Sequence, residues 1–299
     1  MRVTEKTRIG LPRARIEDLR TRQANINEQV STGRRINRPS DDPLGTMRIT
    51  NYQTTERQVE QFQRNLERGS AFLHQADSAL NESVDSLNRI RELTIQSISA
   101  VLTQQDANSL AAEVATIREH LISISNTRVG DQHIFAGFLY DLPAYTAAGV
   151  FQGDTNQVTL EIEDRKVVPI TVPGGAAFGD GTAGTQDVFA TLQNLVTQIP
   201  IRNVFAFANI EAELANLQLA QEQMIQARSQ IGIRIAQTEA ARNVNAFLNE
   251  RVPADISAIA DADMPAAISE LTLVDNALQA TLQTAGRVLN GPTLLDFLR

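Results

Sequence analysis

Apolar residues recur at intervals of seven along the first third of the chain. The repeating positions are Tyr52, Val59, Leu66, Leu73, Leu80 and Leu87. The position three residues further on carries Phe62, Ala76 and Ile90, and is filled only weakly by Gly69 and Ser83. Apolar residues at both positions of a heptad form the seam of a coiled coil. The pattern therefore predicts one long helix from Leu44 to Leu102, which Asp42-Pro43 begins with a side-chain cap and a first-turn proline.

Two further apolar repeats predict helices that pack on the first one. The first runs through Leu110, Val114, Ile117, Leu121 and Ile124. The second runs through Ile210, Leu214, Leu217, Met224, Ile231 and Ile235. The polar break at 103–108 is short enough for a hairpin between antiparallel helices. The first helix should be about 90 Å long, whereas a compact chain of this length is only about 50 Å across, so the pattern predicts an elongated bundle.

Shorter apolar seams lie at the two ends of the chain. The N-terminal seam is Ile9, Ile16, Leu19, Ile26 and Val30. The C-terminal seam is Ile268, Leu271, Leu278, Leu282, Ala285 and Leu289, and an apolar tail of Leu294, Leu295, Phe297 and Leu298 follows it. Asp263 before Met264-Pro265 has the form of a helix cap. Because short helices are marginal alone, we expect the two ends to pair and to bury their outer faces on neighbouring copies. The alternative is that both ends pack on the long helices of their own chain.

The middle of the chain has the alternation of a β-hairpin. Val158, Leu160 and Ile162 alternate with polar residues, and so do Val168, Ile170 and Val172. Nine of the 16 glycines fall between Gly130 and Gly184. The sequence therefore predicts a β-rich insert at 137–200, which ends in a short helix from Asp187 to Ile199.

Together these segments predict a mainly α protein. The expected fold is an elongated antiparallel coiled-coil or helical bundle, formed by the N-terminal and C-terminal arms, with a small β-rich central insert domain. We assign 1–40 and 265–299 to terminal amphipathic helices that serve assembly, 41–136 and 201–264 to the long-helix bundle, and 137–200 to the insert.

Charge is distributed unevenly along the 299 residues. The chain has 35 acidic and 27 basic side chains and a net charge of −8. Residues 1–40 alone carry a net charge of +6, which leaves −14 for the remainder. A basic end and an acidic body suit contact between copies, and a basic helix face exposed to solvent is the alternative. The acidic balance disfavours nucleic acid as a partner. No apolar run is long enough for a membrane helix, and the first twenty residues lack the apolar stretch of a signal peptide, so we expect neither.

The residue types of common catalytic and metal sites are missing or scattered. With no cysteine, the chain has no disulfide, no thiolate metal site and no cysteine nucleophile. Its histidines are His74, His120 and His133; the first two are expected on helix surfaces without a second ligand nearby. No nucleophile elbow, phosphate loop or dinucleotide fingerprint occurs. We therefore expect no enzyme, no cofactor and no metal site.

Three motifs, in order along the chain, carry a family resemblance. The stretch Ser31-Thr-Gly-Arg-Arg-Ile-Asn-Arg-Pro-Ser-Asp-Asp-Pro-Leu-Gly45 resembles the N-terminal signature of the bacterial flagellin superfamily. His133-Ile-Phe-Ala-Gly-Phe138 is similar to the motif that leads into the central domain of that family. Asp261-Ala-Asp-Met-Pro-Ala-Ala-Ile-Ser-Glu-Leu271 and Leu294-Leu-Asp-Phe-Leu298 resemble its C-terminal arm. The resemblance covers 1–140 and 200–299, and the form Pro39-Ser-Asp-Asp-Pro43 is similar to members that join the hook to the filament.

The resemblance implies a structural, mechanical role in the extracellular flagellum. Copies would form a homo-oligomeric ring between the first hook-associated protein and the flagellin filament, after export through the flagellar type III apparatus. A cytoplasmic chaperone would cover the C-terminal helix, with its stripe Leu271, Leu278, Leu282 and Leu289, before export. Arg34, Arg35 and Arg38 beside Asp41 and Asp42 would lie near contacts between subunits, and the tail residues Leu294, Leu295 and Phe297 would serve assembly.

Two other functions stay open at this point. The nearest is a short flagellin, the subunit of the filament itself, which would polymerise into long filaments unaided. The other, from a different class, is an intracellular coiled-coil adaptor, which would be absent from sheared flagella.

Overall fold

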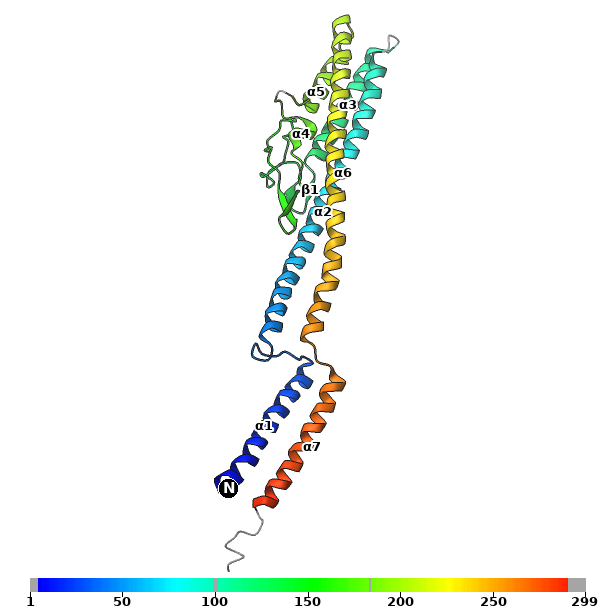
Figure 1. Ribbon diagram of the computed structural model, residues 1–299. Coiled ribbons are helices and arrows are strands. Elements are labelled where there is room, and N and C mark those ends of the chain that lie inside the picture. The colour runs from blue at the N-terminus through cyan, green and yellow to red at the C-terminus, as the bar shows by residue number, and fades with distance from the viewer. Residues whose placement is uncertain (1–4, 99–101, 183, 290–299) are drawn as a thin grey trace, which may run out of the picture. The chain divides into compact units, whose positions relative to one another are not determined.

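The computed structural model describes residues 5–98, 102–182 and 184–289 (Figure 1). Its helices are α1 (Glu5–Thr32), α2 (Pro43–Ser97), α3 (Gln104–Ser125), α4 (Gly174–Phe178), α5 (Val188–Gln198), α6 (Val204–Ala260) and α7 (Met264–Leu289). Its strands are β1 (Arg128–Val129), β2 (Gln132–His133), β3 (Thr159–Glu163) and β4 (Lys166–Pro169). The predicted mainly helical fold with a small β insert is confirmed.

The chain divides into two compact units. Unit 1 consists of Met1–Gln58 and Leu248–Arg299, and unit 2 consists of Val59–Phe247. Helices α2 and α6 therefore contribute residues to both units. The three-part division expected from the sequence stays a prediction.

The core of unit 2 forms where α2, α3 and α6 pack together. The heptad residues Leu73, Leu80 and Leu87 are completely buried there, which confirms the predicted seam. Polar pairs fix the register: Arg228 Nε lies 2.9 Å from Asp77 Oδ1, and Asn245 Nδ2 donates to the main-chain oxygen of Val59 at 3.1 Å. Because early residues of α2 meet late residues of α6, the two helices are antiparallel, as the sequence predicted.

Helix α2 begins at Pro43 as predicted but ends at Ser97. The break between the two helices lies earlier in the chain than the sequence suggested, because α3 already begins at Gln104. Thr103 accepts from the backbone N–H of Asp106, and the Asp106 carboxylate accepts from the backbone N–H of Thr103. This reciprocal cap uses the polar residues of the expected turn as the first turn of a helix. The Thr103 hydroxyl also donates to Asp106 and lowers the pKa of its carboxyl group.

The insert contains the predicted hairpin. Strands β3 and β4 pair antiparallel, with Thr159 opposite Pro169. Pro169 is the last residue of β4, so the second strand is shorter than the apolar alternation suggested. The N–H of Ile170, the next residue, still donates to the main-chain oxygen of Val158 at 2.8 Å. The buried side chains Ile162 and Val168 pack with Leu66 of α2. The predicted short helix is α5, capped by Asp187, whereas β1, β2 and α4 had no clear signal in the sequence.

Candidate functional site

The two terminal helices pair with each other in unit 1. Helices α1 and α7 lie side by side (Figure 1). Ile26, Ala267 and Val274 are buried. Gln23 Nε2 donates to Asp275 Oδ1 at 2.6 Å across the pair. Of the two alternatives that the sequence left open, the structure therefore favours pairing between the two chain ends.

The predicted apolar stripe of α7 is only partly covered. Leu271 and Leu278 are half-buried, whereas Leu282 is exposed, together with Ile268 and Leu273. Val274, which the predicted seam omitted, is more buried than Leu271 and Leu278, and it lies on the same side of the helix, almost one turn from each of them. Leu289 is the last residue of α7; Leu294, Leu295 and Phe297 lie outside the described residues. Helix α7 therefore retains an apolar outer surface after pairing with α1.

The two linkers that precede α2 and follow α6 are hydrogen-bonded to each other. We call this contact the joint, formed by residues 33–42 and 259–263. The N–H of Arg35 donates to the oxygen of Ala260 at 2.6 Å, and the N–H of Ala262 donates to the oxygen of Gly33 at 2.9 Å. Gly33 has a φ of 69°, which glycine adopts without steric cost where the chain leaves α1.

Arg35 connects both sides of the joint through its side chain. Its Nη2 donates to the main-chain oxygen of Ile259 at 2.9 Å and lies 3.4 Å from Asp42 Oδ2. Near the end of α6, a cation satisfies a free carbonyl group and opposes the negative end of the helix dipole. Asp42 Oδ1 accepts from the N–H of Gly45 at 2.8 Å and so caps α2. The N–H of Gly45, more than the guanidinium of Arg35, lowers the pKa of Asp42.

The remaining predicted charges have different environments. Arg38 forms an ion pair with Glu28 of α1 at 3.0 Å, and Asp41 Oδ2 accepts from the backbone N–H of Arg38 at 2.8 Å. The guanidinium of Arg34 is exposed and makes no hydrogen bond or ion pair within the described residues. Arg34 is thus the one predicted cation of the joint whose charged group remains available in the described structure.

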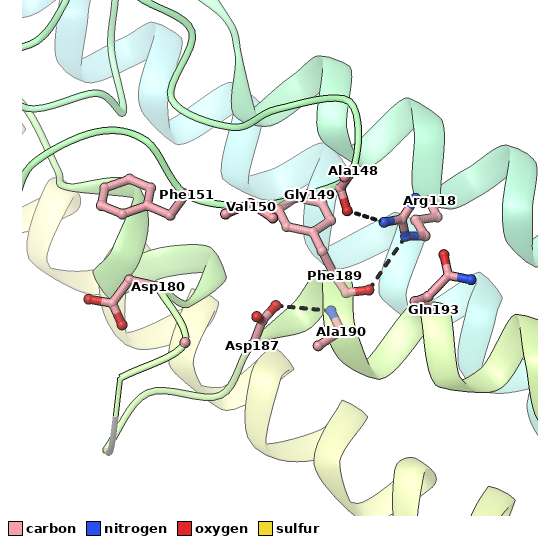
Figure 2. Close-up of a pocket in the computed structure, with 11 residues that line it drawn as sticks. Arg118, Ala148, Gly149, Val150, Phe151, Asp180, Asp187, Phe189, Ala190 and Gln193 are labelled. Atoms are coloured by element: carbon pink, nitrogen blue, oxygen red, sulfur yellow. Dashed lines mark hydrogen bonds between the residues drawn. The ribbon is translucent and has the colours of Figure 1, made fainter.

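A separate pocket of about 500 Å³ lies in unit 2, beside α3, α5 and the loop at 148–151. Figure 2 shows the guanidinium of Arg118 donating to the main-chain oxygens of Ala148 and Phe189, and Asp187 accepting from the N–H of Ala190. Hydroxyl and N–H groups of Thr182 lower the pKa of Asp180 at its edge. Asp187 therefore serves as a helix cap, and Arg118 attaches the insert to α3. The sequence analysis had assigned no site to this pocket.

The described residues contain no cluster of three or more histidine, aspartate or glutamate side chains placed to hold a metal ion. His74 and His120 are exposed, and His120 lies 2.9 Å from Glu82 of α2. Within those same ranges, none of the helices has the combination of length and hydropathy that crossing a bilayer requires.

Several residues of the paired ends and the joint were missed by reasoning from sequence. Glu28, Gln23 and Asp275 occur in polar stretches with no motif, and Ile259 contributes only its carbonyl group. The one available signal for these contacts was the end of a helix shortly before Asp263. The last carbonyl groups of a helix have no partners within the helix and need donors from elsewhere.

Comparison with known proteins gives a match to one family. Residues 13–139 match the bacterial flagellin N-terminal helical region. This segment includes the N-terminal half of the joint, residues 33–42, and the whole of α2.

Similar proteins extend the match to most of the chain. Flagellar hook-associated protein 3 of Salmonella typhimurium is 22% identical over 278 residues, covering 87% of this chain and 88% of that protein. Flagellin of Bacillus subtilis is 26% identical over 275 residues, covering 87% of this chain and 88% of that protein. The crystal structure of flagellar hook-associated protein 3 from Legionella pneumophila superposes with a TM-score of 0.62 at 16% identity, covering 71% of this chain and 98% of that one. The fold is therefore shared along nearly the whole length of that solved protein.

Proposed function

We propose that this chain, which belongs to the bacterial flagellin superfamily, is the subunit that joins the hook to the filament of the bacterial flagellum. The observation that carries the proposal is the similarity to hook-associated protein 3 over 87% of the chain. The sequence form Pro39-Ser-Asp-Asp-Pro43 supports the junction role over that of a filament subunit. The proposed role is mechanical and requires neither catalysis nor a cofactor.

Assembly is assigned to the terminal segments 1–40 and 265–299. The apolar side chains left exposed on α7, such as Leu273 and Leu282, support this assignment because exposed apolar surface favours burial against another molecule. The bundle segments 41–136 and 201–264 would form the outer body, and the insert at 137–200 would add to its surface. Leu271, Leu278 and Leu289, with Leu294, Leu295 and Phe297 of the tail, would be covered as copies assemble.

Within the joint we assign different roles to the three arginines. Arg35 and Arg38 bind groups of their own chain and would set the geometry of the joint together with Asp41 and Asp42. Arg34, with its exposed guanidinium, would contact an acidic group of a neighbouring copy. Arg34→Glu should therefore lower incorporation into flagella without changing the melting temperature. Arg35→Glu should lower both; a drop in melting temperature for Arg34→Glu would contradict the assignment.

The proposed partners are copies of the same chain in a ring, the first hook-associated protein on the hook side and flagellin on the filament side. Export through the flagellar type III apparatus would precede assembly. A cytoplasmic chaperone would cover the exposed surface of α7, so that Leu282→Asp should weaken chaperone binding. Equal binding of the parent and of this variant would remove α7 from that contact.

Deletion of the gene tests the function directly. A strain without it should assemble hooks, release flagellin monomers into the medium and grow no filaments, and a plasmid copy should restore the filaments. Electron microscopy of the cells and immunoblots of the medium measure both effects. A deletion strain that still grows full filaments would refute the junction role.

Flagellin is the second candidate because the Bacillus subtilis flagellin is 26% identical over a similar span. The two functions differ in self-assembly. A filament subunit polymerises alone into long filaments after purification, whereas a junction subunit stays short or monomeric without its neighbours. Light scattering of the purified chain distinguishes them.

A further inference from the structure

Helix α6 has an apolar face that points away from the core of unit 2. We call it the outer face, formed by Ile225, Ile233, Val244 and Phe247, which are between 50% and 65% exposed. At 3.6 residues per turn these four lie within an arc of about 100°. The buried residues Met224, Ile231 and Asn245 lie on the opposite side of the helix. The other positions on the arc carry Gln, Ser, Ala or Asn, so the outer face has no charge.

A second apolar surface lies on the insert. We call residues 138–143 the insert turn; its side chains Phe138, Leu139 and Leu142 are about half exposed. Its backbone is held firmly, because the N–H of Phe138 donates to Asp154 at 3.0 Å and the oxygen of Tyr140 accepts from the N–H of His133 at 2.9 Å. A rigid turn loses little entropy when it docks, so it is a good contact surface.

The two surfaces lie at the same height along unit 2. The pairs Val59–Asn245 and Asp77–Arg228 place Arg68 of α2 level with about residue 237 of α6, close to the middle of the outer face. Arg68 donates to Gln132 of β2 at 2.8 Å, and Gln132 precedes the residue that is bonded to Tyr140 of the insert turn. The insert itself is attached to another flank of α6, through Arg234. Neither surface therefore covers the other within one chain.

We propose that in the assembled ring the insert turn of one copy packs on the outer face of α6 of the next copy. This inference rests on the proposed function. Two different patches that meet in this way form a heterologous contact, which closes into a ring when successive copies do not rise along the axis. Equal height of the two patches is the condition for such a ring.

The size of the outer face suits a contact that forms only during assembly. It is about 33 Å long and about 10 Å wide, so it buries far less than the roughly 800 Å² per partner of a stable complex. The contact becomes effective when the terminal helices already hold neighbouring copies together and raise their local concentration. Its occupant is therefore a second copy in the ring.

The absence of cysteine allows a direct test by disulfide cross-linking. A chain with both Leu142→Cys and Ile233→Cys replaces the parent in cells, and isolated flagella are oxidised and run on a non-reducing gel. The double variant should give a ladder of dimers, trimers and higher species, and each single variant should stay monomeric. Leu142→Cys with Ser109→Cys, whose second thiol lies on the exposed side of α3, is the matched control and should give no ladder.

Two results would overturn the docking. Dimers from Ile233→Cys alone would mean that the outer face pairs with itself, and an incorporated double variant without a ladder would mean that the surfaces do not meet. Filament retention gives a second measurement: Ile233→Glu should leave at least fivefold fewer filaments after shearing, and unchanged retention counts against the contact. If the parent gene fails to restore filaments to a deletion strain, the proposed function itself is wrong; if variants restore them without cross-linking, only the docking fails.

Discussion

Arg35 and Ile259 are 224 positions apart in the sequence, and the guanidinium Nη2 of the first donates to the main-chain oxygen of the second at 2.9 Å. The same nitrogen faces Asp42, the cap of α2. One side chain therefore links the start of α2 to the end of α6. It does so beside the backbone hydrogen bonds that join the two linkers, Arg35 to Ala260 and Ala262 to Gly33. This arrangement makes Arg35 the residue whose loss should loosen the joint most.

We expect Arg35→Leu to speed the hydrogen exchange of the Ala262 amide about fivefold. That amide donates to the main-chain oxygen of Gly33 between the two linkers. Losing the half-exposed hydrogen bond from the Arg35 guanidinium to Ile259 costs about 1 kcal/mol. Exchange measured by mass spectrometry or NMR gives the rate. Arg34→Leu is the control, since the Arg34 guanidinium has no partner within the described residues; equal rates in the two variants would argue against the link.

The stability of unit 1 should fall in acid because of Asp42. The pKa of Asp42 is lowered from 3.8 in the folded chain, so its ionised form favours folding above that pH. This contribution is lost as the pH falls below 3.8 and through the lowered folded value. The melting temperature of the parent should therefore exceed that of Asp42→Asn at pH 6, and the gap should close at the lowest pH.

The control for this pH dependence is Glu250→Gln, because Glu250 is an exposed carboxylate on α6 that has no ion pair among the described residues. Its melting temperature should follow the parent at every pH. A gap between parent and Asp42→Asn that stays constant from pH 6 to the lowest pH would contradict the role of the Asp42 charge.

Val274→Asp should separate the terminal pair while leaving unit 2 folded. Val274 is only 6% exposed, and an unpaired carboxylate in that position costs about 3 kcal/mol. Amides of α1 and α7 should then exchange about a hundredfold faster, while those of Val59–Phe247 keep their protection. The neighbouring substitution Leu273→Asp, on an exposed side chain, should change neither; an equal effect of both would mean that α1 and α7 do not pack through Val274.

Tyr145→Phe should weaken the insert by about 1–2 kcal/mol. The buried phenol donates to the oxygen of Gly179 at 2.6 Å, and its loss leaves a buried carbonyl group without a partner. Burial, reinforced by Asp187 and Asp180, raises the pKa of Tyr145, so the phenol keeps its proton at any working pH. Urea unfolding of unit 2 measures the change, with Tyr140→Phe as the half-exposed control; an unchanged midpoint for Tyr145→Phe would contradict the role of this hydrogen bond.

The sequence predicted the helices well because their signals are local. The heptads of α2, the caps at Asp42 and Asp263, and the β3–β4 alternation each depend on residues within a few positions of one another. Where a local signal had two uses, the prediction failed: the polar residues around Thr103 are typical of a turn, yet they cap α3.

Contacts between distant segments were decided by the tertiary structure alone. The arginines of the joint look alike in the sequence, and only the position of the α6 terminus makes Arg35 a link and leaves Arg34 free to meet a neighbour. In the same way, periodicity could mark Ile233 as part of a helix, but its position along unit 2 relative to the insert turn depends on how α2 and α6 pack. Helical period repeats within a few residues, whereas the pairing of groups more than 200 residues apart is set by how whole helices pack, and no local pattern in the chain contains that information.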